Sequence, residues 1–248
     1  MDNIWVSPIP RFLTLPNMPP TIVPVADAAS LSDASASALR KALFWDRIAR
    51  KYAADAIADV PGYEATLRRV QALLSAKQDV LEIGCGTGTT ALRLAPLTRH
   101  LLATDYSAGM IAIAREKLAA QPVPQLSFEV ADADTPVFEQ GVYDVALAFN
   151  VLHLVSDLDH ALQLAVQTLR PGGLLISKTP CIAEMNPLVP YLALPLMRAI
   201  GKAPRVLCFN AKELQSAIAR QGLEILSVER HGTQGKDIRV FIVARKRA

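Results

Sequence analysis

The stretch that decides the fold is Leu81-Glu82-Ile83-Gly84-Cys85-Gly86-Thr87-Gly88-Thr89. Residues 79–83 form an apolar run of strand length, and residues 89–95 place Leu92 and Ala95 three apart, as on one side of a helix. Alternate glycines allow a sharp turn and a close approach of a ligand to the backbone. The unpaired N–H groups of a helix start attract polar or anionic groups. The sequence therefore predicts a strand, a tight turn and a helix that together bind a nucleoside-like cofactor.

The glycine spacing separates two classes of cofactor. A dinucleotide fingerprint, Gly-x-Gly-x-x-Gly, needs its third glycine at Thr89, but the third glycine of this chain is Gly88. An acidic residue, Glu82, also precedes Gly84 by two positions. The loop resembles the cofactor loop of class I S-adenosylmethionine-dependent methyltransferases, most closely the branch that contains quinone-biosynthesis and natural-product enzymes.

Further segments match the same family in the same order. Residues 100–105 read as a second strand that ends in Asp105, whose carboxylate can accept both ribose hydroxyl protons. Residues 126–131 read as a third strand, followed by Asp132 and Ala133, which in the resembling family hold the adenine ring. The apolar run 143–150 and the turn and strand 169–176 complete five ordered matches.

The end of the chain indicates how the sheet is completed. Residues 223–229 and 238–243 read as two strands that are too close in sequence for a parallel connection, so they must be antiparallel. We expect an α/β fold with a Rossmann-like, seven-stranded, mostly parallel sheet, an antiparallel C-terminal hairpin and helices on both faces.

The resemblance also implies which residues hold S-adenosylmethionine. Residues 45–52 resemble a segment from which an aromatic side chain, here Tyr52, reaches the methyl donor in many small-molecule members. The full set expected to contact the cofactor is Tyr52, Glu82, Gly84, Cys85, Gly86, Gly88, Asp105, Tyr106, Met110, Asp132, Ala133 and Asn150.

Composition limits the alternatives. The 248 residues suit one large domain, half of them are hydrophobic, and the net charge of +3 is too small to demand a nucleic-acid partner. No run of 18 apolar residues and no signal peptide are evident. The three cysteines show neither metal-ligand spacing nor a convincing disulfide set, so we expect no metal and a cytoplasmic location.

The chain divides into an N-terminal extension, residues 1–36, and a single methyltransferase domain, residues 37–248. The extension is rich in Pro, Ala and Ser, and Met18 is an alternative natural start. Within the domain, residues 37–76 carry two apolar helical stripes and are expected to cover the cofactor.

One histidine stands where a general base would be useful. His153 follows the fourth predicted strand, at the edge of the sheet where ligands bind in open α/β folds. Its ordinary pKa near 6.5 suits proton transfer, although a structural role is the alternative. Cys181 follows the fifth strand, where RNA cytosine methyltransferases can carry a nucleophile, but its expected role is that of a small buried residue.

Residues 180–209 are expected to form a lid-like insertion. Residues 185–200 are strongly apolar and are interrupted by three prolines. Such a segment covers an apolar substrate pocket, or it forms a surface that pairs with another subunit or a membrane. A homodimer is therefore left open.

The resemblance implies in-line transfer of a methyl group to a small, apolar acceptor, with alignment and exclusion of water as the main contributions of the protein. Three alternatives are methylation of a protein or nucleic acid, a non-catalytic interaction protein that binds S-adenosylmethionine, and a nicotinamide-dependent oxidoreductase.

Overall fold

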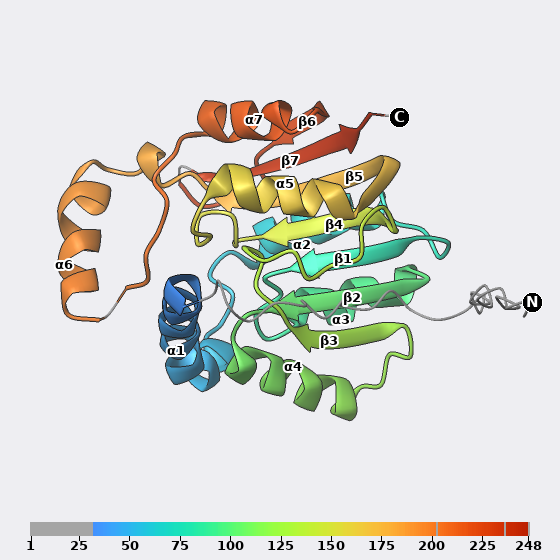
Figure 1. The fold of residues 1–248 in the computed structure, drawn as a ribbon, viewed down its shortest axis with the longest axis horizontal. Coiled ribbons are helices and arrows are strands. Elements are labelled where there is room, and N and C mark those ends of the chain that lie inside the picture. Colours follow the sequence, from blue (N-terminus) through green and yellow to red (C-terminus); the bar gives the residue numbers. More distant parts are fainter. Residues whose placement is uncertain (1–31, 202, 236, 248) are drawn as a thin grey trace, which may run out of the picture.

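The computed structural model describes residues 32–201, 203–235 and 237–247 (Figure 1). Most of the predicted extension, Met18 included, lies outside these residues. Their core is a seven-stranded sheet in the order β3-β2-β1-β4-β5-β7-β6. The strands are β1 (Asp79–Ile83), β2 (His100–Asp105), β3 (Leu126–Val130), β4 (Tyr143–Phe149), β5 (Leu169–Pro180), β6 (Leu223–Glu229) and β7 (Arg239–Lys246).

Strand directions confirm the predicted fold. The pairs β3–β2, β2–β1, β1–β4 and β4–β5 are parallel, whereas β7 is antiparallel to both of its neighbours, β5 and β6. The last strand of the predicted hairpin is thus inserted between β5 and β6.

Helices cover both faces of the sheet because successive strand residues point to opposite sides. Val80 of β1 packs in a core cluster with α2 (Val60–Gln71), α3 (Thr89–Leu94) and α4 (Ala108–Ala120). The next residue, Leu81, packs in the opposite cluster with α5 (Leu158–Thr168) and α7 (Ala211–Arg220). All five residues of β1 are buried, as expected for a central strand of a doubly covered sheet.

Side-chain caps fix where several helices begin. Ser107 accepts a hydrogen bond from the backbone of Met110 at the start of α4. Asp157 caps α5, and Asn210 forms a capping box with Glu213 at the start of α7.

The two N-terminal helices differ in their bounds from the prediction. The first helix, α1 (Ser32–Ala54), begins before residue 37, where the helical segment was expected to start. The second, α2, begins after the cap Asp59 and ends at Gln71, before the expected end of that segment at residue 76.

The predicted lid-like insertion projects from the body of the molecule. Residues 185–201, here called the arm, contain a π-helical segment (Val189–Ala193) and α6 (Leu194–Ala199), and they lie beyond α1 at the left of Figure 1. The Arg47 guanidinium ties the arm to α1 by donating to the Gly201 carbonyl at 2.7 Å. Several large apolar side chains of the arm are exposed, namely Leu188, Tyr191, Leu192, Leu196, Met197 and Ile200.

Among the described residues, none of the helices combines the length and the apolar character that crossing a bilayer requires.

Candidate active site

A cavity of about 580 Å³ lies at the carboxyl ends of the parallel strands. The ends of β1, β2, β4 and β5 form its floor, and residues of α1 and α2 form its walls. A cavity of this size suits a cofactor or a small molecule, and its position is the one at which open α/β sheets bind ligands.

The three loop positions require glycine for different structural reasons. All have positive φ angles, of 70° at Gly84, 54° at Gly86 and 73° at Gly88. A Cβ atom on Gly84 would meet Val151 at 2.4 Å, and one on Gly88 would meet Phe128 at 2.5 Å, so these two glycines allow close packing within the protein. Gly84 and Gly86 line the cavity, whereas Gly88 does not. A Cβ atom on Gly86 would meet only the Tyr52 ring, at 3.8 Å, so a side chain would not clash there.

Asp105 stabilises the glycine turn from the neighbouring strand. One carboxylate oxygen accepts from the Gly86 N–H at 3.0 Å, and the other accepts from the Ser107 N–H at 2.9 Å. The residue lines the cavity and is only 8% exposed. Burial raises the pKa of Asp105 although both N–H donors oppose the shift. The carboxylate therefore combines a structural role in the loop with free acceptor capacity beside the cavity.

Glu82 is a buried acidic residue of the cavity wall whose carboxyl group is not fully hydrogen-bonded. It is 2% exposed, and its Oε2 atom has no hydrogen-bond partner among the described residues. Burial, followed by the negative charge of Asp105, raises the pKa of Glu82 to about 8. An acceptor atom of this kind is expected to meet a donor group of a ligand.

Aromatic and sulfur-containing side chains line the cavity beside the loop. Tyr52 and Trp45 of α1 pack edge to face with ring centroids 6.0 Å apart, and both line the cavity, as do Tyr106 and the buried Met110. Burial raises the pKa of Tyr106 above its usual range, so this hydroxyl stays protonated.

The helix α1 is anchored to the start of α4 by the carboxylate of Asp46. Asp46 of α1 accepts hydrogen bonds from the Ser107 hydroxyl at 2.5 Å and from the Gly109 N–H at 2.8 Å, both at the start of α4. This contact fixes the aromatic side chains of α1 over the loop.

Asn150 has a backbone conformation that is uncommon for a residue with a side chain. Its φ angle of 55° is the only positive value among the described non-glycine residues. Asn tolerates this conformation better than most residues, and here it lets the chain leave β4 along the cavity wall. The Asn150 N–H donates to the Lys178 carbonyl of β5 at 2.8 Å.

Other predicted site residues lie elsewhere. Asp132 and Ala133 follow β3 and are half-buried, but they do not line the cavity. His153 does not line it either; its Nδ1 atom has no partner among the described residues, and burial lowers the pKa of this imidazole to about 4. A histidine in that state is a weak base. None of the described residues between 180 and 209 lines the cavity.

The thiols near the site are not arranged for nucleophilic attack. Cys85 lines the cavity, but burial raises its pKa well above the ordinary value. Cys181 is fully buried, and burial raises its pKa to about 11. Reactive cysteines need a depressed pKa, so both thiols are expected to be inert.

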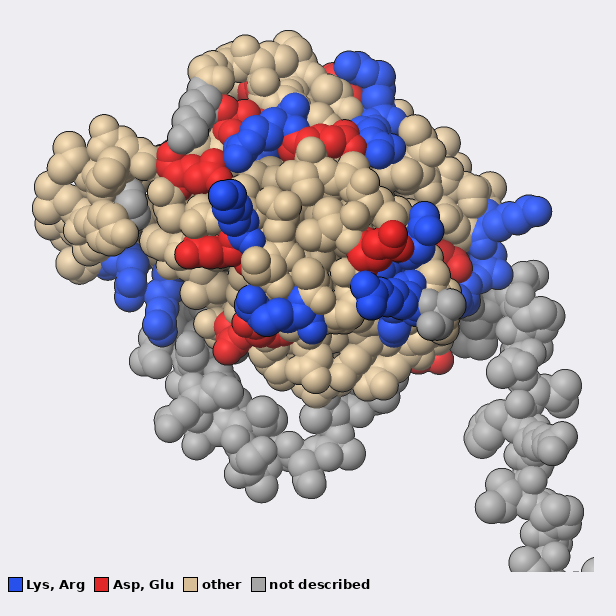
Figure 2. All heavy atoms as spheres, turned by 90° about the horizontal axis from the view of Figure 1, so that it is seen from above, with Lys and Arg blue, Asp and Glu red and all other residues tan. Residues whose placement is uncertain are grey.

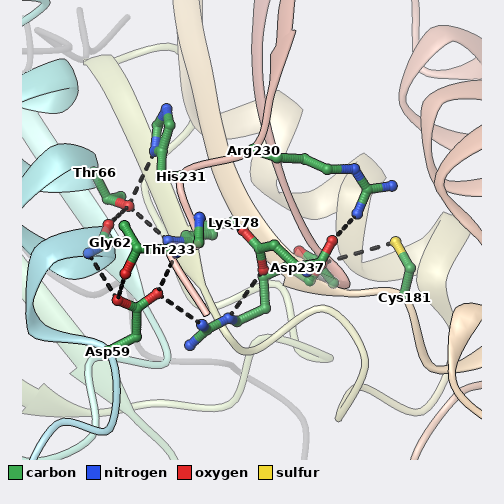
Figure 3. Close-up of polar contacts among 12 residues, drawn as sticks. Asp59, Gly62, Thr66, Lys178, Cys181, Arg230, His231, Thr233 and Asp237 are labelled. Atoms are coloured by element: carbon green, nitrogen blue, oxygen red, sulfur yellow. Dashed lines mark hydrogen bonds and ion pairs between the residues drawn. The ribbon is translucent and has the colours of Figure 1, made fainter. Parts of the chain in front are cut away.

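The side of the cavity opposite the glycine loop was missed from the sequence. Asp59, Thr66, Lys178 and Arg239 line it, and they come from the start of α2, from β5 and from the start of β7 (Figure 3). Asp59 accepts from the Gly62 N–H at 3.0 Å and from the Thr233 N–H and hydroxyl at 2.9 and 2.6 Å. These bonds, those of Thr233 first, lower the pKa of Asp59 to about 2. We call Asp59, Thr66, Lys178 and Arg239 the lysine side of the cavity, and Glu82, Gly86 and Asp105 the loop side.

The loop side fits the cofactor that the sequence predicts. It offers a backbone turn without side chains at Gly86, a carboxylate with acceptor capacity at Asp105, and an unpaired acceptor at Glu82. S-adenosylmethionine carries ribose hydroxyls and an amino group, which are the donors that these acceptors require.

Known proteins support the same assignment. Residues 80–173 match the family model described as a methyltransferase domain. The chain is 32% identical over 99 residues to the ubiquinone/menaquinone biosynthesis C-methyltransferase UbiE of Geobacter sulfurreducens, covering 38% of each protein. It is 37% identical over 109 residues to the hybrid PKS-NRPS synthetase mpsA of Macrophomina phaseolina, covering 41% of this chain and 3% of that protein.

A solved structure agrees at the level of the fold. An S-adenosylmethionine-dependent methyltransferase from Mesorhizobium loti superposes with a TM-score of 0.62 at 20% identity, covering 75% of this chain and 98% of that one. The matched sequence region holds Glu82, Gly86 and Asp105, which form the loop side of the cavity. Residues 80–173 therefore resemble a methyltransferase domain in sequence, and the fold of the chain is that of the solved methyltransferase structure.

Proposed function

We propose that this protein transfers a methyl group from S-adenosylmethionine to a small, largely apolar acceptor molecule. The observation that carries the proposal is one continuous cavity that joins the loop side to the lysine side. A site for the donor and a space for a second molecule therefore share one chamber.

On the loop side, we assign Asp105 to the ribose hydroxyls, the Gly84–Gly86 backbone to close contact with the cofactor, and Glu82 to its amino group. Tyr52, Tyr106 and Met110 would pack against the adenosyl and methionine parts. The resemblance also assigns Gly88, Asp132 and Ala133 to the cofactor site; Gly88 would act through packing, and the other two require a movement of the loop after β3.

The walls between the two sides favour an apolar acceptor. Five apolar side chains line the cavity from α2 and from the segment at the end of β4: Leu67, Val70, Phe149, Val151 and Leu154. The exposed charges, in contrast, are mixed: acidic and basic side chains alternate over the face in Figure 2 and form no continuous basic surface for nucleic acid.

The protein contributes alignment and exclusion of water. When bound, S-adenosylmethionine supplies a methyl group on a sulfonium, which is already a good leaving group. The α1 and α2 walls close the chamber above the strand ends, and Asn150 and Asp105 fix the positions of its floor. Orientation of this kind contributes several kcal/mol, on the order of 7 to 11 in favourable cases.

Two experiments test the proposal. Calorimetry should detect binding of S-adenosylhomocysteine by the wild-type protein, with no comparable binding of NADH. Product detection with a methyl-labelled donor across phenol, quinone and amine libraries should then find a methylated small molecule. Silence toward S-adenosylhomocysteine would end the proposal, and modification of protein or RNA alone would replace the acceptor class.

Two further parts of the proposal concern the cellular location of the protein and its assembly. The three cysteines are free, which suits a reducing compartment such as the cytoplasm. The exposed apolar arm is a candidate surface for a second copy of the chain.

A further inference from the structure

Lys178 occupies an unusual place for a lysine. It is near the carboxyl end of β5, it pairs in register with Phe149 of β4, and it is only 6% exposed. Its side chain nevertheless lines the cavity. Lysine is seldom buried to this degree unless its ammonium group is paired.

The groups that contact Lys178 do not neutralise the positive charge of a protonated amine. Its Nζ atom donates to the Thr66 hydroxyl at 2.6 Å, and among the described residues no carboxylate forms an ion pair with it. The nearby acids, Asp59 and Asp237, are instead paired with Arg239 at 3.8 and 3.4 Å. An ammonium group with three donors thus has one neutral acceptor in the protein.

The surroundings favour the neutral amine. Burial first, and then the positive charge of Arg239, lowers the pKa of Lys178, whereas Asp237 and Asp59 act in the opposite direction. A neutral lysine amine that faces a reaction chamber is able to accept a proton.

Thr66 links Lys178 by hydrogen bonds to groups farther from the cavity. Its Oγ1 atom lies 3.0 Å from His231 Nδ1 and also reaches the Gly62 carbonyl at 2.8 Å. The other imidazole nitrogen of His231, Nε2, lies 3.0 Å from a Glu229 carboxylate oxygen. The Glu229 side chain is 28% exposed and also accepts from Arg69 at 2.9 Å. Figure 3 shows Lys178, Thr66 and His231 joined by hydrogen bonds. The contact of His231 with the partly exposed Glu229 extends this chain from the cavity toward the surface.

We propose that Lys178 removes the proton of an acidic hydroxyl group on the acceptor, and that Thr66 and His231 pass this proton to Glu229. The proposal rests on the methyltransferase function proposed above and names the acceptor class as phenols and enols.

The proton balance is complete within the chain. The acceptor O–H bond breaks, its electron pair stays on the acceptor oxygen, and an N–H bond forms on Lys178. In the return step Lys178 gives a proton to the Thr66 oxygen, while the Thr66 hydroxyl gives its own proton to His231 Nδ1. His231 releases its Nε2 proton to Glu229, which exchanges it with water. This leaves His231 with its proton on Nδ1, so before the next turnover Nδ1 loses that proton and Nε2 regains one by exchange with water.

The basicity of the Lys178 amine limits which acceptor hydroxyl groups can lose their proton to it. Phenols have pKa values near 10, and the lowered pKa of Lys178 leaves its amine neutral over more of the pH range in which phenols are still protonated, so transfer to Lys178 is feasible for phenols and for the more acidic enols. Simple alcohols are several units weaker as acids and would keep their proton. The apolar walls of the cavity suit an aromatic ring beside the amine.

The first test compares Lys178→Met with the control Lys212→Met, which removes an exposed lysine of α7. Both proteins should bind S-adenosylhomocysteine as the wild type does. Methyl transfer to unactivated phenols should fall by about 100-fold or more in Lys178→Met alone, the usual contribution of a positioned base. Transfer to para-nitrophenol at alkaline pH should be largely retained, because this acceptor is already ionised.

The second test needs no acceptor. The ¹³Cε resonance of Lys178, assigned by its loss in Lys178→Met, should titrate below the ordinary lysine range. Thr66→Val removes the oxygen that stabilises the ammonium form, so it should move the Lys178 titration to a still lower pH. Titration of Lys178 in the ordinary lysine range would overturn the proposal.

A positioning role for His231 is tested by His231→Gln, which keeps a polar group beside Thr66. The variant should slow transfer to unactivated phenols by about tenfold and change the pH profile of kcat, without moving the Lys178 resonance. An unchanged pH profile would remove His231 from the proton path.

The outcomes separate the two proposals. If wild-type protein fails to bind S-adenosylhomocysteine, the methyltransferase function itself is wrong. If it binds and methylates phenols but Lys178→Met does so equally well, only the role of Lys178 is wrong. If it binds and methylates only amines or carbon acids without an enol form, the acceptor class is wrong.

Discussion

The two sides of the cavity are built in different ways. The loop side comes from two adjacent parallel strands and one contiguous stretch of sequence, residues 82–88, with Asp105 in the neighbouring strand. The lysine side combines α2, β5 and β7, and the hydrogen-bonded pair Lys178 and Thr66 within it are 112 positions apart in the sequence. The loop side can therefore be recognised as a motif, whereas the lysine side exists only after the chain has folded.

This difference suggests a division of work. A motif fixed by backbone geometry suits the constant partner of a reaction, since glycine positions tolerate little variation. Side chains gathered from distant elements can be exchanged one at a time, which suits the partner that varies between related enzymes. The substitutions below test whether the two sides behave so differently.

The largest effect is expected at the loop glycines. Gly84→Ala and Gly88→Ala each combine a positive φ with a Cβ contact of 2.5 Å or less, and each should lower the free energy of unfolding by about 3 kcal/mol. Gly86→Ala has the strain without the clash, so its loss should be about 1 kcal/mol. Chemical denaturation measures all three, and equal losses would contradict the packing roles of Gly84 and Gly88.

The next effect is a pH dependence caused by Glu82. Its folded pKa of about 8 lies above the ordinary 4.5, so the stability associated with the protonated form is fully present below about pH 4.5 and is lost as pH rises through about 8. Glu82→Gln should remove this loss, which is on the order of 3 kcal/mol. Unfolding measured at acidic, neutral and alkaline pH checks the result, and parallel curves for both proteins would show that Glu82 ionises normally.

A smaller effect is expected for cofactor affinity. Asp105→Asn keeps the size of the side chain but weakens its acceptor capacity, so binding of S-adenosylhomocysteine should lose about 1 to 3 kcal/mol. Calorimetry should detect no change for the control Asp159→Asn, which alters an exposed carboxylate of α5. A loss of equal size in Asp132→Asn would show that the loop after β3 also reaches the cofactor.

The smallest effect is expected in the arm. Tyr191 and Leu192 are 81% and 62% exposed, so replacing both by Ser should change the free energy of unfolding by less than about 0.5 kcal/mol and leave cofactor affinity unchanged. Sedimentation of the two proteins shows whether the arm joins two copies of the chain. A marked loss of stability would mean that these side chains are covered in the folded protein.

Much of the fold followed from the sequence because its signals are local. The strand–turn–helix around Gly84 and Gly86 depends on neighbouring residues, and the structure confirms it. The caps at Ser107 and Asn210 are local features of the same kind. The bounds of α1 and α2 were less accurate, since helix propensity and capping compete at helix ends.

The far side of the cavity could not be predicted in the same way. Lys178 lies between Ser177 and Thr179 in a strand, and nothing in these neighbours indicates that Thr66 lies 2.6 Å from its amine. His153 attracted attention because it follows β4, yet it does not line the cavity. Local patterns do not fix such placements.

The insertion of β7 between β5 and β6 has a consequence for how the protein forms. During synthesis β6 leaves the ribosome before β7, the sole strand beside which it lies in the described sheet. Until β7 arrives, β6 has no partner and β5 keeps an open edge. Closure of the sheet is therefore a late event of assembly, and it also brings Arg239 to its place beside Asp59.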